Sequence, residues 1–374
     1  MTLGDTIKGM VGIDPTGHAD PDMKAVLDAL RSLNAKPIED CTVEEARHQP
    51  TPADAVKKLM QDPAFSARPA LELEAVRTQD IMIPGAAGSN SARVYTPQGE
   101  GPFPLILYFH GGGWVIADLD TYDATPRSMA AQSRAIVVSA HYRQAPEHRL
   151  PAAHDDAFAA WGWLIGNATS LGGNPDRIAI MGESAGANLA INVSIRARNT
   201  GIRMPMHQAL IYPVASNNIV SISYEENRNA KPLNKPMMLW FMHNVINSES
   251  DLTSPLIDVV SADLSRLPPA VVVTAGIDPL RSDGEKLAQK LHSAGVPVEH
   301  RNYRGATHEF FGMAAVVQAA RDAQAFVSLA QRQAFGGGRF EAVSGPFGSR
   351  SIFGRNGPRL HSPIRCNTMS RCCV

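Results

Sequence analysis

The sequence predicts an α/β fold in which helices cover both faces of a mostly parallel sheet. Short apolar runs rich in β-branched residues recur between about residues 75 and 335. Longer amphipathic segments separate these runs, so strand and helix signals alternate along the chain. Strands buried on both faces read as near-continuous apolar runs, and their alternation with helices is typical of parallel crossover units.

The elements follow one another in a regular order. The predicted strands are LILYF at 105–109, AIVVSA at 135–140, RIAIM at 177–181, QALIYP at 208–213, AVVVTA at 270–275 and the run at 297–303. The predicted helices are 151–166, 185–198, 281–294 and 314–332. In an open sheet of this kind the active site is expected at the carboxyl ends of the strands.

Two segments break this order and are expected to form a helical cap over one edge of the sheet. Residues 1–70 read as helices, one of which has Thr51 as a plausible N-cap and Pro52 in its first turn. Residues 214–255 hold polar loops and then a helix rich in Met, Trp and Phe. The predicted core is therefore 71–335, with the cap insertion at 214–255.

The segment 336–374 differs from the rest of the chain. It is rich in Gly, Ser and Pro, carries six Arg against one Glu, and shows neither helical nor strand periodicity. We interpret it as a disordered tail or one foreign to the fold. A basic arm that binds a partner is the alternative interpretation.

Composition and charge exclude several classes of function. A net charge of -1 argues against a nucleic-acid-binding surface. No run of about 18 apolar residues would span a membrane, and the first residues lack the apolar stretch of a signal peptide. We therefore expect no nucleic acid or membrane partner, and a cytoplasmic location. Only Cys41 precedes residue 366, so the main body has no disulfide framework.

A candidate nucleophile lies in the pentapeptide GESAG at 182–186, between a predicted strand and a predicted helix. A G-x-S-x-G motif in this context predicts a tight elbow that exposes the Ser184 hydroxyl at the sheet edge. The following helix would point its amide groups toward the same place. A helix N-cap serine is the alternative interpretation.

A serine hydroxyl needs a base, and the base needs an acid to orient it. His308 lies in a loop between the last predicted strand and helix, where catalytic side chains are common. Asp278 follows the strand AVVVTA and would share an edge of the sheet with Ser184. Asp283 is better explained as a charge at the start of the next helix. The other histidines after Ser184 fit the role less well: His207, His243, His292, His300 and His361.

The sequence HGGGW at 110–114 follows a predicted strand with three glycines. Attack on a carbonyl creates an oxyanion, which needs backbone donors at close range. Glycines leave no Cβ in the way, so Gly111 and Gly112 are the expected donors, together with the amide of Ala185. We expect Gly113 to turn the chain back and His110 to serve the scaffold.

Four motifs coincide: HGGGW, GESAG, GIDPLRSDG and GATHEFFGM. Together they resemble those of the bacterial hormone-sensitive-lipase-like esterases of the α/β-hydrolase superfamily, over roughly residues 20–335. The resemblance implies an α/β-hydrolase fold with a helical cap and a serine carboxylesterase acting on short- to medium-chain acyl esters. It carries the nucleophile to Ser184, the acid to Asp278 and the base to His308. It implies a small-molecule ester substrate, an acyl-enzyme intermediate and no metal or other cofactor, and it allows a homodimer.

The chain departs from the family pattern at four positions near these motifs: Gln144, Glu183, Ala187 and Glu309. Glu309 replaces the usual glycine after the base. A carboxylate there would favour the protonated form of His308, and we hypothesise that it raises the acid limb of the pH–rate profile.

The remaining questions concern substrate and chemistry. Candidate substrate-binding residues are Trp114, Tyr224, Met238, Trp240 and Phe241, although Met-rich apolar helices often serve packing alone. A related acyl hydrolase, such as an amidase, carbamate hydrolase or lactonase, would use the same machinery. A non-catalytic ligand-binding protein is a third hypothesis. It is disfavoured because receptors that resemble this family have lost the base, whereas His308 is present.

Overall fold

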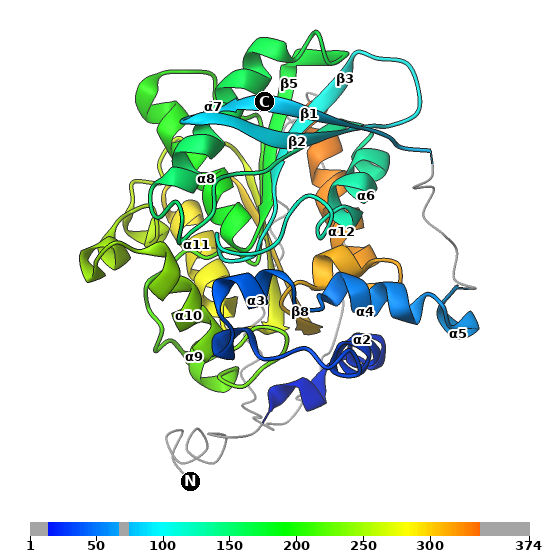
Figure 1. Ribbon diagram of the computed structural model, residues 1–374. Coiled ribbons are helices and arrows are strands. Elements are labelled where there is room, and N and C mark those ends of the chain that lie inside the picture. The colour runs from blue at the N-terminus through cyan, green and yellow to red at the C-terminus, as the bar shows by residue number, and fades with distance from the viewer. Residues whose placement is uncertain (1–13, 67–74, 337–374) are drawn as a thin grey trace, which may run out of the picture. The chain divides into compact units, whose positions relative to one another are not determined.

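Eight strands form one sheet in the computed structural model, which describes residues 14–66 and 75–336 (Figure 1). In spatial order they are β1 (Arg77–Gly85), β2 (Gly88–Thr96), β4 (Ile136–Ala140), β3 (Phe103–Phe109), β5 (Gly173–Glu183), β6 (Gln208–Ile211), β7 (Ala270–Ile277) and β8 (Val298–Thr307). Strand β2 runs antiparallel to both of its neighbours, and all other neighbouring pairs are parallel. The predicted, mostly parallel sheet is thus confirmed.

Side chains of the central strands alternate between two hydrophobic clusters, one on each face. In β3, Leu105 and Leu107 belong to one cluster, whereas Ile106 and Tyr108 belong to the other, and all four are fully buried. A strand places successive side chains on opposite faces, so a continuous apolar run requires cover on both sides.

Helices supply that cover. The helices that cover the sheet are α6 (Ala124–Ser133), α7 (Ala152–Asn167), α8 (Ala185–Thr200), α11 (Arg281–Ser293) and α12 (Gln318–Phe335). Buried residues of α7, α8 and α11 belong to the first cluster, and those of α6 and α12 to the second. The expected three-layer arrangement is confirmed, and α6 is an element that the sequence did not predict.

The N-terminal segment is helical. It contains η1 (Pro15–His18), α2 (Pro21–Arg31), η2 (Ile38–Asp40), α3 (Val43–Arg47), α4 (Pro52–Leu59) and α5 (Pro63–Ser66). Thr51 is the N-cap of α4, because its hydroxyl accepts from the Asp54 amide while the Asp54 carboxylate accepts from the Thr51 amide. Arg47 joins the segment to the core by donating to the Val115 carbonyl oxygen and pairing with Glu147.

The segment between β6 and β7 also departs from the strand–helix order. It contains α9 (Ile222–Glu226), α10 (Lys235–Val245), η3 (Glu249–Thr253) and η4 (Val259–Ser261). Part of the N-terminal segment, η2 and α3, in blue, lies beside α10, in yellow-green (Figure 1). Asn234 donates to the Glu39 carboxylate at 2.7 Å, and the Trp240 indole donates to the Cys41 carbonyl oxygen at 3.1 Å.

Two expectations concern residues that the structure does not describe. The predicted boundary at residue 70 and the segment 336–374, except Gly336, lie outside the described residues. Within the described ranges, no helix is long and apolar enough to cross a membrane.

Candidate active site

Ser184 lies in the elbow between β5 and α8. Its backbone has φ 55° and ψ -118°, a conformation that a residue with a side chain rarely adopts. A Cβ on Gly186 would lie 2.1 Å from the Phe109 carbonyl oxygen, so the elbow closes against β3 only because glycine stands there. The strained turn directs Ser184 away from both regular elements, as the pentapeptide predicts.

Asp278 and His308 come from the loops that follow β7 and β8. The His308 Nε2 atom lies 3.0 Å from Ser184 Oγ, and its Nδ1 atom lies 2.7 Å from Asp278 Oδ2. The other carboxylate oxygen of Asp278 accepts from the Leu280 amide at 2.8 Å, which fixes the carboxylate. All three side chains are buried. The structure therefore brings together the three residues selected from the sequence.

The charge of His308 depends on its neighbours. Burial alone would lower the pKa of His308, but the charge and hydrogen bond of Asp278 outweigh this effect. The pKa of His308 therefore lies above its usual value, and the Glu309 and Glu183 carboxylates raise it further. Since a carboxylate only accepts, Nδ1 of His308 carries the hydrogen, and Nε2 faces Ser184 as the proton acceptor when the ring is neutral.

The loop 110–113 passes beside this triad. Gly112 and Gly113 have φ of 96° and 58°, and a Cβ on Gly112 would lie 2.2 Å from the Ile116 carbonyl oxygen. Both glycines therefore permit a backbone that other residues would strain. Among the described residues, the amides of Gly111, Gly112 and Ala185 donate to no other protein group.

His110 is held as part of the scaffold. Its Nδ1 lies 2.8 Å from the Gly111 carbonyl oxygen, so this nitrogen donates, and its Nε2 then accepts from His141 Nδ1 at 3.0 Å. Tyr142 donates to the carbonyl oxygens of His110 and Gly111. Burial lowers the pKa of His110 to about 3, so its ring stays neutral and orders the glycine loop.

A small apolar cleft of about 30 Å³ adjoins Ser184 and His308. Its walls include Trp114, Met238 and Phe241, three of the substrate-binding residues expected from the sequence. Val214, Leu233 and Met242 also line it, and sequence analysis missed them. Tyr224 and Trp240 were expected beside the substrate but line neither cavity described here. Tyr224 is buried in the core, and Trp240 donates to the Cys41 carbonyl oxygen.

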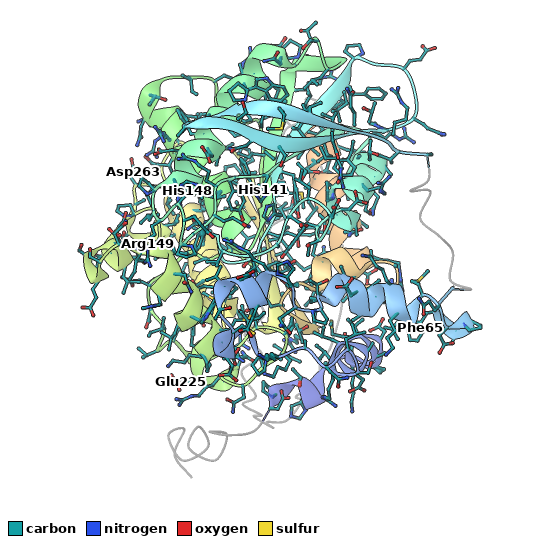
Figure 2. All side chains as sticks on the ribbon, viewed as in Figure 1. Phe65, His141, His148, Arg149, Glu225 and Asp263 are labelled. Atoms are coloured by element: carbon teal, nitrogen blue, oxygen red, sulfur yellow. The ribbon has the colours of Figure 1, made fainter. Side chains whose placement is uncertain are left out.

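A larger cavity of about 550 Å³ lies between the N-terminal segment and the core. The residues Glu183, Tyr122 and Glu309 line it, and Glu309 lines the small cleft as well. His141, labelled in Figure 2, follows β4 and lines the same cavity. In the sequence, Glu183 and Glu309 stood out only as departures from the family pattern. That departure was the one sequence feature that pointed to these two cavity-lining residues.

Asp283 lies in the first turn of α11, as expected, and has a second role. Its carboxylate is buried and accepts from the amides of Ala215 and Ser216 at 3.1 and 2.9 Å. Burial raises the pKa of Asp283 to about 7. Asp283 therefore fixes the chain that follows β6, in addition to lying in the first turn of α11. In the described ranges, no group of three or more His, Cys, Asp or Glu side chains is arranged to hold a metal ion.

Comparisons with known proteins show which family the chain resembles. A family model described as "alpha/beta hydrolase fold" matches residues 106–312. Esterase LipI of Mycobacterium tuberculosis is 36% identical over 321 residues, which cover 84% of this chain and 96% of that protein. Carboxylesterase NlhH of the same species is 40% identical over 236 residues, 62% of this chain and 74% of that protein.

Solved structures are similar as well. A hyperthermophilic esterase from Pyrobaculum calidifontis has a TM-score of 0.72 and 34% identity, and the match covers 82% of this chain and 96% of that one. A thermostable esterase from Pseudomonas putida has a TM-score of 0.75 and 28% identity, with 85% and 98% covered.

Proposed function

The chain belongs to the α/β hydrolase family and is a carboxylic ester hydrolase, and we propose that it acts by acyl transfer to Ser184. Two hydrogen bonds support this proposal most directly: Ser184 Oγ donates to His308 Nε2 at 3.0 Å, and His308 Nδ1 donates to Asp278 Oδ2 at 2.7 Å. This is the arrangement in which a base can accept the serine proton while an acid holds the ring.

In the first step, Ser184 Oγ attacks the ester carbonyl carbon and its proton passes to His308 Nε2. Asp278 then stabilises the imidazolium through the Nδ1 hydrogen bond, without taking the proton itself. The raised pKa of His308 is consistent with this role, because it makes the ring a stronger base.

The carbonyl oxygen becomes an oxyanion during this attack. The amides of Gly111, Gly112 and Ala185 are the proposed donors to it, since they donate to no other protein group in the described residues. Loss of one such donor typically costs about 3–4 kcal/mol of transition-state stabilisation. No metal or cofactor is required in this scheme.

The ester bond then breaks, and His308 returns its proton to the departing alcohol oxygen. Water subsequently attacks the acyl-enzyme, with His308 again accepting a proton, and releases the acid and the free serine. His308 protonates the alcohol oxygen, and the neighbouring Glu309 lines both the cleft and the larger cavity. We therefore propose that the alcohol portion extends from His308 past Glu309 into the larger cavity. The acyl portion then occupies the cleft beside Trp114 and Phe241.

The size of the cleft favours short acyl chains. Its volume of about 30 Å³ admits few non-hydrogen atoms unless the side chains around it move. We therefore propose acetate and similar short esters as the preferred substrates, at the lower end of the range that the family resemblance implies.

The test is covalent labelling combined with hydrolysis. The purified protein should hydrolyse an aryl acetate, and a fluorophosphonate should stop the reaction while adding one adduct to the peptide that contains Ser184. Hydrolysis without that adduct, or an adduct on another serine, contradicts the proposed nucleophile. A matched aryl amide, hydrolysed faster than the ester, would instead assign the chain to the amidases.

A further inference from the structure

The larger cavity carries an excess of unpaired negative charge. Five carboxylate side chains line it: Asp14, Glu39, Asp118, Glu183 and Glu309. In the part of the chain that the structure describes, none of the five lies within ion-pair distance of a lysine, arginine or histidine. Their hydrogen-bond partners are instead neutral amides and hydroxyl groups.

The cations of the same cavity are mostly neutralised by other groups. Arg31, Lys36 and Arg47 pair with Asp28, Glu45 and Glu147 at 3.2, 3.0 and 2.7 Å, and none of these three partners lines the cavity. Lys231, the remaining cationic residue among the lining residues, is exposed to solvent. Among the described lining residues, carboxylates without an ion-pair partner therefore outnumber cations without one.

Two of the carboxylates lie beside the reacting groups. Glu183 and Glu309 are the chain neighbours of Ser184 and His308, and Glu309 lines both the cavity and the cleft. Glu183 is fully buried and accepts from Tyr108 at 2.7 Å and from Tyr212. Glu309 is only half-buried and accepts from Tyr122 at 3.1 Å, which leaves it available to a molecule in the cavity.

The backbone conformation of Glu309 would suit glycine better, which indicates that the carboxylate side chain has a function at this position. Glu309 has φ 66° and ψ 2°, in the left-handed region that glycine adopts freely and other residues adopt at a cost of about 1–2 kcal/mol. A fully buried carboxylate without a cationic partner, such as Glu183, is costly as well, and burial raises the pKa of both Glu183 and Glu309. A cation bound in the cavity would offset the free-energy cost of both carboxylates.

We propose that the larger cavity binds the alcohol portion of esters that carry a positively charged amine, and that Glu309 selects for this charge. The inference rests on the proposed function, because it places the alcohol on the His308 side. The tyrosine ring of Tyr122 and the half-buried carboxylate of Glu309 offer the cation a π-face and a counter-charge on the same wall.

Two acetate esters of nearly equal shape test the inference. Choline acetate carries a permanent positive charge, whereas 3,3-dimethylbutyl acetate has carbon in place of nitrogen and is neutral. The expected result for the unmodified protein is a kcat/KM about tenfold higher for the choline ester. In Glu309→Gln, which keeps size and removes charge, that ratio should fall toward one.

Control variants separate charge selection from a general loss of structure. Glu249→Gln removes the same charge from an exposed side chain outside the cavity, and its ratio should match that of the unmodified protein. Glu309→Gly removes the carboxylate and the backbone strain together, and it should lose the preference as Glu309→Gln does. Choline alone should also inhibit aryl acetate hydrolysis more strongly than 3,3-dimethylbutanol does.

The outcomes distinguish this inference from the proposed function. Hydrolysis of both esters with equal kcat/KM, or a choline preference that survives in Glu309→Gln, overturns the inference and leaves the esterase intact. Failure of the unmodified protein to hydrolyse either these esters or an aryl acetate overturns the proposed function as well.

Discussion

The cleft at Ser184 and the neighbouring larger cavity share part of their lining, yet they differ in size and chemistry. The cleft has about 30 Å³ and apolar walls that include Trp114 and Phe241. The cavity has about 550 Å³ and is lined by carboxylates and hydroxyl groups as well as apolar side chains. Glu309 borders both of them. We propose from this difference that the protein selects strictly for the acyl group of an ester and permissively for its alcohol.

The two spaces also come from different parts of the chain. Helix α10, in the segment between β6 and β7, supplies Met238 and Phe241 to the cleft. The N-terminal segment supplies much of the cavity wall, including Thr51 and Val56. We propose that these two segments together form the cap, each governing one half of the substrate. Substitutions in one segment should therefore change selection of the acyl portion, and substitutions in the other should change selection of the alcohol portion.

The largest effect should come from the proposed nucleophile, which lines the cleft. Ser184→Ala removes the proposed nucleophile, so kcat should fall by roughly 10⁴- to 10⁶-fold for every ester, whatever its acyl or alcohol portion. Steady-state rates with the two acetate esters and an aryl acetate measure it. Ser170→Ala, at an exposed serine, is the matched control and should retain full activity. A loss confined to one class of ester would mean that the two spaces do not serve one nucleophile.

Enlarging the cleft should change acyl selection alone. Phe241→Ala removes a side chain that is 3% exposed, so we expect about 3 kcal/mol lower stability and a shift of the acyl preference toward longer chains by about tenfold in kcat/KM. Initial rates with aryl acetate and aryl hexanoate measure the shift. Trp240→Ala removes a neighbouring aromatic ring that does not line the cleft, and its acyl preference should not change. The same shift in both variants would mean that the cleft does not determine the acyl preference.

The Glu309 carboxylate should affect the pH dependence of the reaction. The neutral form of His308 is active, so activity falls as the pH drops through the pKa of His308, which Asp278, Glu309 and Glu183 raise. Removing one negative charge in Glu309→Gln lowers that pKa, so the acid limb of kcat/KM should move to lower pH. A neutral aryl acetate is the substrate for the profile. An acid limb that stays in place or moves to higher pH contradicts the assigned influence of Glu309.

The smallest effect should come from the wall of the cavity. Thr51→Ala removes the N-cap of α4 and should lower the stability of this helix by about 1 kcal/mol. Amide hydrogen exchange should be faster in residues 52–59, and KM for esters of large alcohols should rise by roughly twofold to threefold. The ratio of aryl acetate to aryl hexanoate hydrolysis should stay constant, and a change in that ratio would argue against separate selection.

The sequence was sufficient to select three residues that lie together in the structure, because the fold and the motifs indicate one edge of the sheet. Ser184, Asp278 and His308 each follow a parallel strand, and the carboxyl ends of such strands meet at one edge. Elements whose burial does not show as an apolar run were missed. In β1 most residues are exposed, and only Ile83 is buried, so the strand has no apolar signal.

Helix α6 was missed for a related reason. It packs on α12 through small polar side chains, with Ser128 donating to Gln324 at 2.6 Å and Ser133 to Gln331 at 2.8 Å. Such contacts leave no apolar periodicity for sequence analysis to detect. The lining of the cavities could not be predicted either. Trp240 and Phe241 are adjacent aromatic residues, and the sequence does not show that only Phe241 lines the cleft.

The most direct test that the cleft selects the acyl portion and the cavity admits the alcohol portion uses two series of substrates, both measured on the unmodified protein. In one series the acyl chain grows from acetate to octanoate with a fixed alcohol, and in the other the alcohol grows by the same steps with a fixed acetyl group. We expect kcat/KM to fall steeply beyond about four acyl carbons, since the cleft is small, and to change little with the alcohol. A steep dependence on the alcohol with a flat dependence on the acyl chain would contradict the assignment of the two spaces.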